Sequence, residues 1–390
     1  MTTHTPAPAA TTPPAAPTDA PAVGTWTLTW HGVRTVAALE LRQRVRSSRW
    51  KVALGVWFAV VAAITLLAGG VMLFVEEASY DTQGRGVALG AVVTVLVLGL
   101  GLLVTPTLTS TSVNGDRAAG TLATLQVTLL SPVEIALGKL LAAWASACAF
   151  LVVSLPFYVV ALLMGGVPAW TLPRVLLLTA LLLAAVCGIG LGWSARAARP
   201  AGSTVLTFVT VAALTVFSPV FYGLTYPFLS SSQEVQVYGV PDDHWAAVDD
   251  FWATHDDGDV GVPPEPTCKV FTAQRPVAHT EATWWLLAIN PFVIVADGAL
   301  PGTSDGSGSV VEEVRSTTQG LRATRLGAPA VLDECWTEDR DGAPAERDAA
   351  GPIWPYGLAA NLLLGALGFV TAVRRLRIPQ RTLPRGTRVA

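Results

Sequence analysis

Six long apolar segments alternate with polar stretches along the chain. These segments are nearly free of charged residues and cover 52–75, 86–107, 140–164, 175–193, 205–226 and 353–373. A hydrocarbon core about 30 Å thick is crossed by about 20 apolar residues in a helix. The pattern therefore predicts an all-α polytopic membrane protein with six transmembrane helices.

Basic residues gather beside the first and the last apolar segments. They are Arg34, Arg42, Arg44, Arg46, Arg49 and Lys51 before the first segment, and Arg374, Arg375, Arg377, Arg381, Arg385 and Arg388 after the last. Because loops rich in Lys and Arg stay on the cytoplasmic side, both termini are expected there, with 374–390 as a basic cytoplasmic tail. Both termini lie on the same side of the membrane only if the number of spans is even, and six spans meet this condition.

The composition agrees with a multi-pass protein of the plasma (cytoplasmic) membrane, surrounded by lipids. Of the 390 residues, 52% are hydrophobic and only 14% are charged. This hydrophobic fraction exceeds the one that a water-soluble core needs. The formal net charge of -3 argues against binding to nucleic acid. Residues 1–30 are rich in Ala, Pro and Thr, so we expect a disordered N-terminal tail.

The segment 31–51, which leads into the first span, has an apolar stripe. Val33, Ala37, Leu41 and Val45 are spaced four apart, as on one face of a helix. The spacing predicts an amphipathic helix on the cytoplasmic membrane surface, whose arginines meet anionic lipid headgroups. An ordinary basic flank beside a span explains the same pattern.

Residues 227–352 separate the fifth and sixth spans, and the number of spans places them outside the cell. They carry most of the acidic residues and two of the four cysteines, Cys268 and Cys335. An oxidising exterior favours a disulfide between these two cysteines, so we expect a small folded extracellular domain. The paired aspartates lack the pattern of a calcium loop and are interpreted as solvated surface, with no metal site.

The stretch 283–300 is apolar but is interrupted by Asn290 and Pro291. Proline suits the first turn of a helix that is capped by Asn, so two short helices are predicted here. We predict that 283–300 forms a re-entrant or interfacial helical hairpin on the outer side of the membrane, which turns at Asn290 and Pro291. Such a hairpin does not cross the membrane, so the number of spans remains six. An apolar core strip of the extracellular domain is the alternative.

The cytoplasmic loop 111–139, between the second and third spans, contains the most specific pattern. Gly120 and Thr121 are expected to open a helix, and Ser131 and Pro132 are expected to cap and start another one. Glu134 then falls in the first turn, where a negative charge is favourable. The pattern predicts a helix, a turn and a helix that continues into the third span.

This loop resembles the coupling loop of type-2 ATP-binding-cassette (ABC-2) exporter membrane subunits. The matching residues are Gly120, Thr121, Leu122, Leu125, Ser131, Pro132, Glu134, Ile135, Leu137, Gly138 and Lys139. The sequence departs from the family pattern where the acidic pair is reduced to Asp116 and Arg117, and where Ala123 replaces a Glu. The six spans, the surface helix and the split hairpin also fit this family.

The resemblance implies a permease without catalytic residues or cofactors of its own. Two copies of a cytoplasmic ABC ATPase, which hold ATP and Mg, would contact the loop and the helix before the first span. The permease would pair with a second copy or with a paralogue, and would export an apolar or amphipathic substrate such as a lipid, glycolipid, peptide or drug-like molecule. Asp116 and Arg117 would join the matching residues as ATPase-coupling residues.

Three other interpretations compete with this one. The loop by itself is also compatible with a plain amphipathic connector. A membrane-anchored receptor or sensor with a ligand-binding outer domain is the alternative function. A membrane enzyme is disfavoured, because no Ser/His/Asp set, HExxH helix or pair of intramembrane carboxylates is present in the sequence. A Walker A loop is also absent from the sequence. Such a loop needs a glycine five residues before its Gly-Lys pair, and Val133 stands at that position before Gly138 and Lys139.

Overall fold

The computed structural model describes residues 24–74, 82–121, 130–254, 262–299, 309–336 and 350–377. Within these ranges, six helical segments are long and apolar enough to cross a membrane, which confirms the predicted number. They are α2 (Ser48–Phe74), α3 (Thr82–Thr109), α6 (Pro132–Leu163), α7 (Thr171–Arg196), the continuous helix formed by α8 (Pro200–Ala212), η1 (Ala213–Phe217) and α9 (Ser218–Leu229), and α14 (Trp354–Arg375). Their length and composition are those of a multi-pass membrane protein.

Helix α7 forms the centre of the bundle and is the most buried of the six candidate spans. It packs closely along α14, because glycines allow the two backbones to meet. A Cβ on Gly188 would lie 2.3 Å from the carbonyl oxygen of Gly365, and a Cβ on Gly192 would lie 2.5 Å from the Gly368 Cα. Small residues are a common means of close helix packing in membranes.

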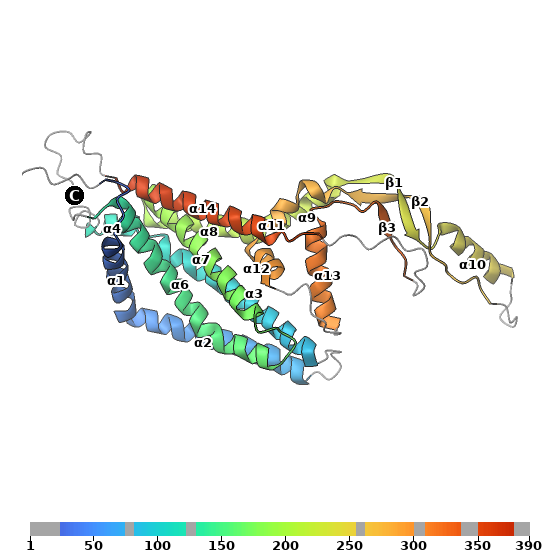
Figure 1. Cartoon of the computed structure of the whole chain (residues 1–390), viewed down its shortest axis with the longest axis horizontal. Helices are drawn as coiled ribbons and strands as arrows, with labels where there is room; N and C mark the ends of the chain where they lie inside the picture. Colours follow the sequence, from blue (N-terminus) through green and yellow to red (C-terminus); the bar gives the residue numbers. More distant parts are fainter. Residues whose placement is uncertain are drawn as a thin grey trace, which may run out of the picture.

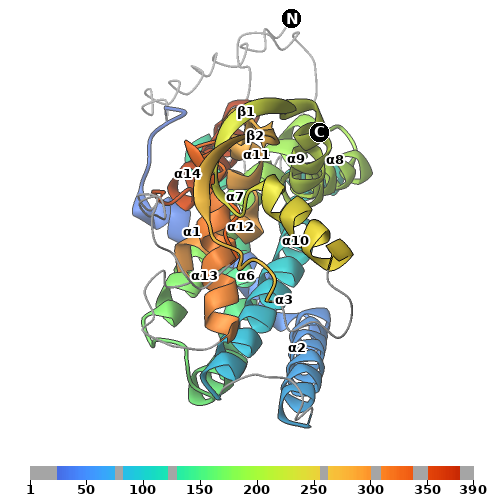
Figure 2. The ribbon, with the colours of Figure 1, turned by 90° about the vertical axis from the view of Figure 1, so that its right-hand side faces the viewer.

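Helix α2 lies at the edge of the bundle, beside α3 and α6 (Figures 1 and 2). Most of its surface is exposed, in contrast to α7. The shorter helix α1 (Trp30–Arg46) precedes it, and a break at Ser47 changes the chain direction between the two. Helices α1 and α4 (Asn114–Ala118) lie at one end of the bundle, whereas the strands lie at the opposite end (Figure 1).

The insertion between α9 and α14 contains a sheet, so the expectation of an all-α fold is wrong in this part. Strand β1 (Ser230–Gly239) pairs antiparallel with β2 (Lys269–Ala278) and parallel with β3 (Val331–Asp333), in the order β2-β1-β3. The insertion also contains helices α10 (Asp242–Thr254) and α13 (Ser309–Ala323), the short turn η2 (Thr280–Ala282) and two further short helices described below. Alternating residues such as Val235 and Val237 gave a strand signal that the long apolar segments obscured.

The predicted disulfide between Cys268 and Cys335 is confirmed. Cys268 directly precedes β2, and Cys335 lies two residues after the end of β3. Because β1 lies between these two strands, the disulfide joins them across the end of the central strand. The disulfide therefore links the two outer strands of the sheet covalently and holds β3 in place, although β3 is only three residues long.

The predicted break at Asn290 and Pro291 is also confirmed. It separates α11 (Trp284–Ala288) from α12 (Pro291–Ala299), and the Asn290 side chain accepts a hydrogen bond from the Phe292 amide at 2.9 Å. Helix α12 packs against α7 and α14, so the hairpin belongs with the helical bundle rather than with the sheet. The buried Asp297 strengthens this attachment, since it binds Arg322 and accepts from the amides of Ile353 and Trp354.

Candidate functional site

The predicted coupling residues gather where α1 crosses the start of α6. We call this contact the α1–α6 junction, and it comprises Thr29, Gly32, Val36 and Glu40 on the α1 side and Ser131, Glu134, Gly138 and Lys139 on the α6 side. Figure 1 shows the two helices side by side at the end of the bundle opposite the strands.

The start of α6 follows from its local sequence. The Ser131 side chain accepts a hydrogen bond from the Glu134 amide at 3.2 Å, and the Glu134 carboxylate accepts one from the Ser131 amide at 2.8 Å. Pro132 occupies the first turn, where it removes no helical hydrogen bond. The predicted cap at Ser131 is confirmed, and the structure adds that Ser131 and Glu134 form a reciprocal capping box.

Glu134 also caps α1, which the sequence did not reveal. Its Oε1 accepts hydrogen bonds from the Thr29 amide at 2.6 Å and from the Thr29 hydroxyl at 2.5 Å. The same hydroxyl accepts from the Gly32 amide at 3.2 Å, which makes Thr29 the N-cap of α1. In addition, the Ser131 hydroxyl donates to the Thr27 carbonyl. A single carboxylate, 3% exposed, therefore holds the beginnings of both helices together.

Two glycines permit this close approach. A Cβ on Gly32 would lie 2.7 Å from the carboxyl carbon of Glu134, and a Cβ on Gly138 would lie 2.6 Å from the Val36 Cβ. A side chain at position 32 would displace the Glu134 carboxylate, and one at position 138 would push α1 and α6 apart. The glycine in the Gly138-Lys139 pair is therefore required by the packing of α1 on α6.

Lys139 adds a charged contact to the junction. Its ammonium group lies 2.5 Å from a carboxylate oxygen of Glu40 in α1 and 2.5 Å from one of Asp116 in α4. The lysine side chain is 2% exposed, while the two carboxylates are 23% and 29% exposed. Because burying an unpaired charge is costly, this arrangement favours all three elements in one geometry.

Helix α4 is anchored to the rest of the bundle through Asn114. The Asn114 side chain donates to the Ser203 hydroxyl at 2.7 Å and accepts from the Ser194 hydroxyl at 3.1 Å. Ser194 also accepts from the Val113 amide, so the end of α7 and the start of α8 both hold the loop. The loop is thereby connected to α1, α6, α7 and α8.

The tip of the loop has a different character from the junction. Arg117, Gly120 and Thr121 are exposed to solvent. Gly120 follows α4 with a φ of +72°, a left-handed conformation that glycine adopts without strain. The helix expected to begin at Gly120 and Thr121, including Leu122 and Leu125, lies outside the described residues beyond Thr121.

The predicted coupling residues therefore divide into two groups. Ser131, Glu134, Ile135, Gly138 and Lys139 are buried, and Pro132 is half-buried. The exposed group is Arg117, Gly120 and Thr121, with Asp116 between the groups. The missed residues, Thr29, Gly32, Glu40, Asn114, Ser194 and Ser203, pair with distant partners. Only Thr29 carried a local signal, as a capping residue before a helix.

Helix α1 packs on α6 with a face that differs from the apolar stripe predicted to lie on the membrane surface. Gly32, Val33 and Val36 are buried against α6, whereas Val45, at the end of the predicted stripe, is 57% exposed. The helix also ends at Arg46, earlier than predicted. Helix α1 thus turns Gly32 and Glu40, together with Val33 and Val36, toward α6.

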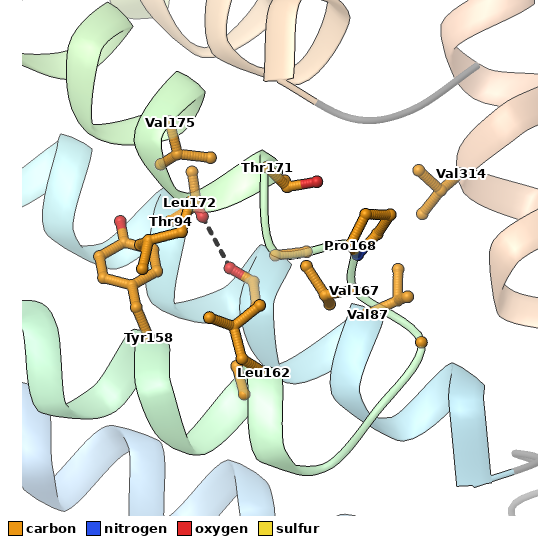
Figure 3. Close-up of a pocket in the computed structure, with 14 residues that line it drawn as sticks. Val87, Thr94, Tyr158, Leu162, Val167, Pro168, Thr171, Leu172, Val175 and Val314 are labelled. Carbon is orange, nitrogen blue, oxygen red and sulfur yellow. Dashed lines mark hydrogen bonds between the residues drawn. The ribbon is translucent and has the colours of Figure 1, made fainter. Parts of the chain in front are cut away.

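A small pocket lies at the opposite end of the bundle, between α3, α6 and α7 (Figure 3). Tyr158, Thr94 and Thr171 supply its polar groups, and Val314 of α13 closes one side. Its cavity volume is about 50 Å³. Small-molecule sites usually measure about 300–1,000 Å³, so this pocket does not accommodate a drug-sized cargo.

The described residues contain no group of three or more His, Cys, Asp or Glu side chains that could hold a metal ion. Comparison with protein-family models finds no model that matches the chain. Comparison with curated protein sequences also finds no match.

Proposed function

We propose that this chain is the membrane-spanning permease subunit of an ATP-driven exporter of the ABC-2 type. The α1–α6 junction is the observation that carries the proposal. A coupling device must transmit a push on a cytoplasmic loop to the spans, and a rigid connection is needed for this. The junction connects the loop to α1 and α6, and Asn114 connects it to α7 and α8.

The division into buried and exposed residues supports a specific distribution of roles. Glu134, Gly138 and Lys139 position α1 and α4 on α6 and do not themselves face a partner. Arg117, Gly120 and Thr121 are exposed at the tip and are the contacts for two copies of a cytoplasmic ATPase. ATP and Mg bind to that partner chain, and this chain moves between inward and outward states as a dimer.

The proposed orientation places both termini and the loop tip in the cytoplasm and the sheet-containing insertion outside the cell. Two features support it: the basic residues beside α2 and α14, and the location of α1 and α4 opposite the strands (Figure 1). A disulfide in the insertion suits an oxidising exterior. The spans carry few ionisable groups, so an apolar or amphipathic cargo is proposed.

The proposal is tested by purifying the full chain from its native membrane in mild detergent and identifying the proteins that remain bound. We expect a protein with a Walker A loop and an ATP hydrolysis rate that rises when it associates with this chain. A preparation that is folded and dimeric but associates with no ATPase contradicts the proposal.

A further inference from the structure

A groove of about 980 Å³ runs along α2 and α3, next to the turn between α1 and α2. Val52, Val56 and Val60 of α2 form one wall, and Leu100 and Val104 of α3 form the other. Because Val52, Val56 and Val60 are exposed, the groove is open to the surroundings of the helical bundle.

Aromatic side chains form the base of this groove. Trp57 packs on Phe150 with ring centroids 4.8 Å apart, and Trp50 packs on the same ring at 5.2 Å. The Trp57 indole donates to the Ser154 hydroxyl at 2.9 Å, which leaves only apolar ring surface toward the trough. The groove is therefore a fixed apolar surface several residues long.

One end of the groove is basic and polar. Arg44, Ser47, Ser48 and Arg49 line this end of the groove, together with Thr107 of α3 and Thr111, which follows α3. The Arg44 guanidinium donates through Nη2 to the Leu108 carbonyl at 3.1 Å. Its Nη1 is buried and has no acceptor among the described residues.

The charge of Arg44 is not neutralised by a direct ion pair in the described part of the chain. Glu40 lies one turn away, but its carboxylate binds the ammonium group of Lys139 at 2.5 Å. Burial lowers the pKa of Arg44, while Glu40 acts in the opposite direction. The mouth of the groove is thus suited to an anion, and its trough is suited to a hydrocarbon chain.

The anion cannot come from an apolar span of a second copy that packs into the groove. The helix from 200 to 229 contains no Asp or Glu, and neither do α2, α3, α7 or α14. The only acidic residue in the six spans is Glu134, which is buried in the junction. A phospholipid, in contrast, carries a phosphate next to two acyl chains.

We propose that this groove binds an anionic glycerophospholipid, with its phosphate between Arg44 and Arg49 and one acyl chain along α2 and α3. The lipid comes from the leaflet beside α1, where basic residues attract anionic headgroups. This inference goes beyond the exporter function and does not depend on an ATPase partner.

Native mass spectrometry of the full chain in mild detergent tests the proposal, with dioleoyl phosphatidylglycerol and dioleoyl phosphatidylcholine as probes. We expect the wild-type protein to bind phosphatidylglycerol at least tenfold more tightly than phosphatidylcholine. The R44Q/R49Q variant should lose this preference. The matched control R46Q changes an exposed arginine outside the groove and should retain the preference within twofold.

A second variant tests the trough and remains informative if R44Q does not fold. Val56→Trp fills the apolar groove and should weaken both lipids at least fivefold, and R49Q alone should reduce the preference for phosphatidylglycerol. Inorganic phosphate at millimolar concentration should not displace the lipid. Equal displacement by phosphate, an unchanged preference in R44Q/R49Q, or a loss of dimer in Val56→Trp with lipid binding unchanged would each overturn the proposal.

Discussion

Glu134 of α6 accepts hydrogen bonds from both the amide and the hydroxyl of Thr29, which stands 105 residues earlier in the chain. This relationship explains why one carboxylate, two helix beginnings and two glycines occur together. These hydrogen bonds hold α1 and the start of α6 together as one rigid unit.

Glu134→Ala should detach α1 from α6. The change leaves the amides of Thr29 and Ser131 without their acceptor and opens space at Gly32, which we expect to cost about 2–4 kcal/mol. Unfolding by titration from mild detergent into SDS measures this loss. Glu134→Gln keeps the shape and one acceptor, so its loss should be smaller. Equal stability of Glu134→Ala and wild type would contradict the bridging role.

Gly138→Ala should destabilise the same contact by a steric mechanism. The added methyl group would meet the Val36 Cβ at 2.6 Å, and overpacking of this kind costs about 1–3 kcal/mol. Gly202→Ala is the matched control, because nothing lies within 4 Å of a Cβ on that helical glycine. Limited trypsin digestion should cut α1 faster in Gly138→Ala only. Identical digestion of both variants would argue against close packing at Gly138.

Lys139 and Glu40 should be energetically coupled. Lys139→Met leaves Glu40 and Asp116 facing each other without a cation, whereas the double variant Lys139→Met with Glu40→Gln removes part of that repulsion. The double-mutant cycle should therefore give a coupling of about 1–3 kcal/mol. Strictly additive losses of unfolding free energy would show that the pair contributes nothing to the junction.

Cys268→Ser should loosen the insertion without affecting the junction. A disulfide that closes a loop of 67 residues contributes roughly 4 kcal/mol in the chain-entropy model. Hydrogen exchange in β1 and β2 should accelerate, while exchange at the start of α6 should not change. The free-cysteine replacement Cys148→Ser serves as control, because that residue is not in a disulfide. Faster exchange throughout the bundle would contradict an independent insertion.

Local patterns in the sequence predicted much of this structure. The six apolar helices follow from segment length, the start of α6 from Ser131 and Pro132, the hairpin from Asn290 and Pro291, and the disulfide from its cysteines. Each of these depends on neighbouring residues or on composition, which is why single-sequence reasoning reached them.

Contacts between distant segments were beyond sequence reasoning. Nothing near Thr29 indicates that its partner is Glu134, and the burial of Lys139 depends on carboxylates from two other helices. The face of α1 that packs on α6 was not predicted for the same reason, since Gly32 and Val36 fit α6 by shape rather than by apolar periodicity. The sequence pointed to the α6 side of the junction and the loop tip, but not to their partners in α1, α7 and α8 or to the division into buried and exposed groups.

The most direct measurement of the central claim is site-specific photo-crosslinking in intact membranes. A benzoyl-phenylalanine in place of exposed Arg117 should crosslink to a Walker A ATPase. The same group at exposed Asp243 of α10, at the opposite end of the molecule, should not (Figure 1). Crosslinking to the ATPase at position 243 but not at 117, or at neither position in a folded dimer, would contradict the account.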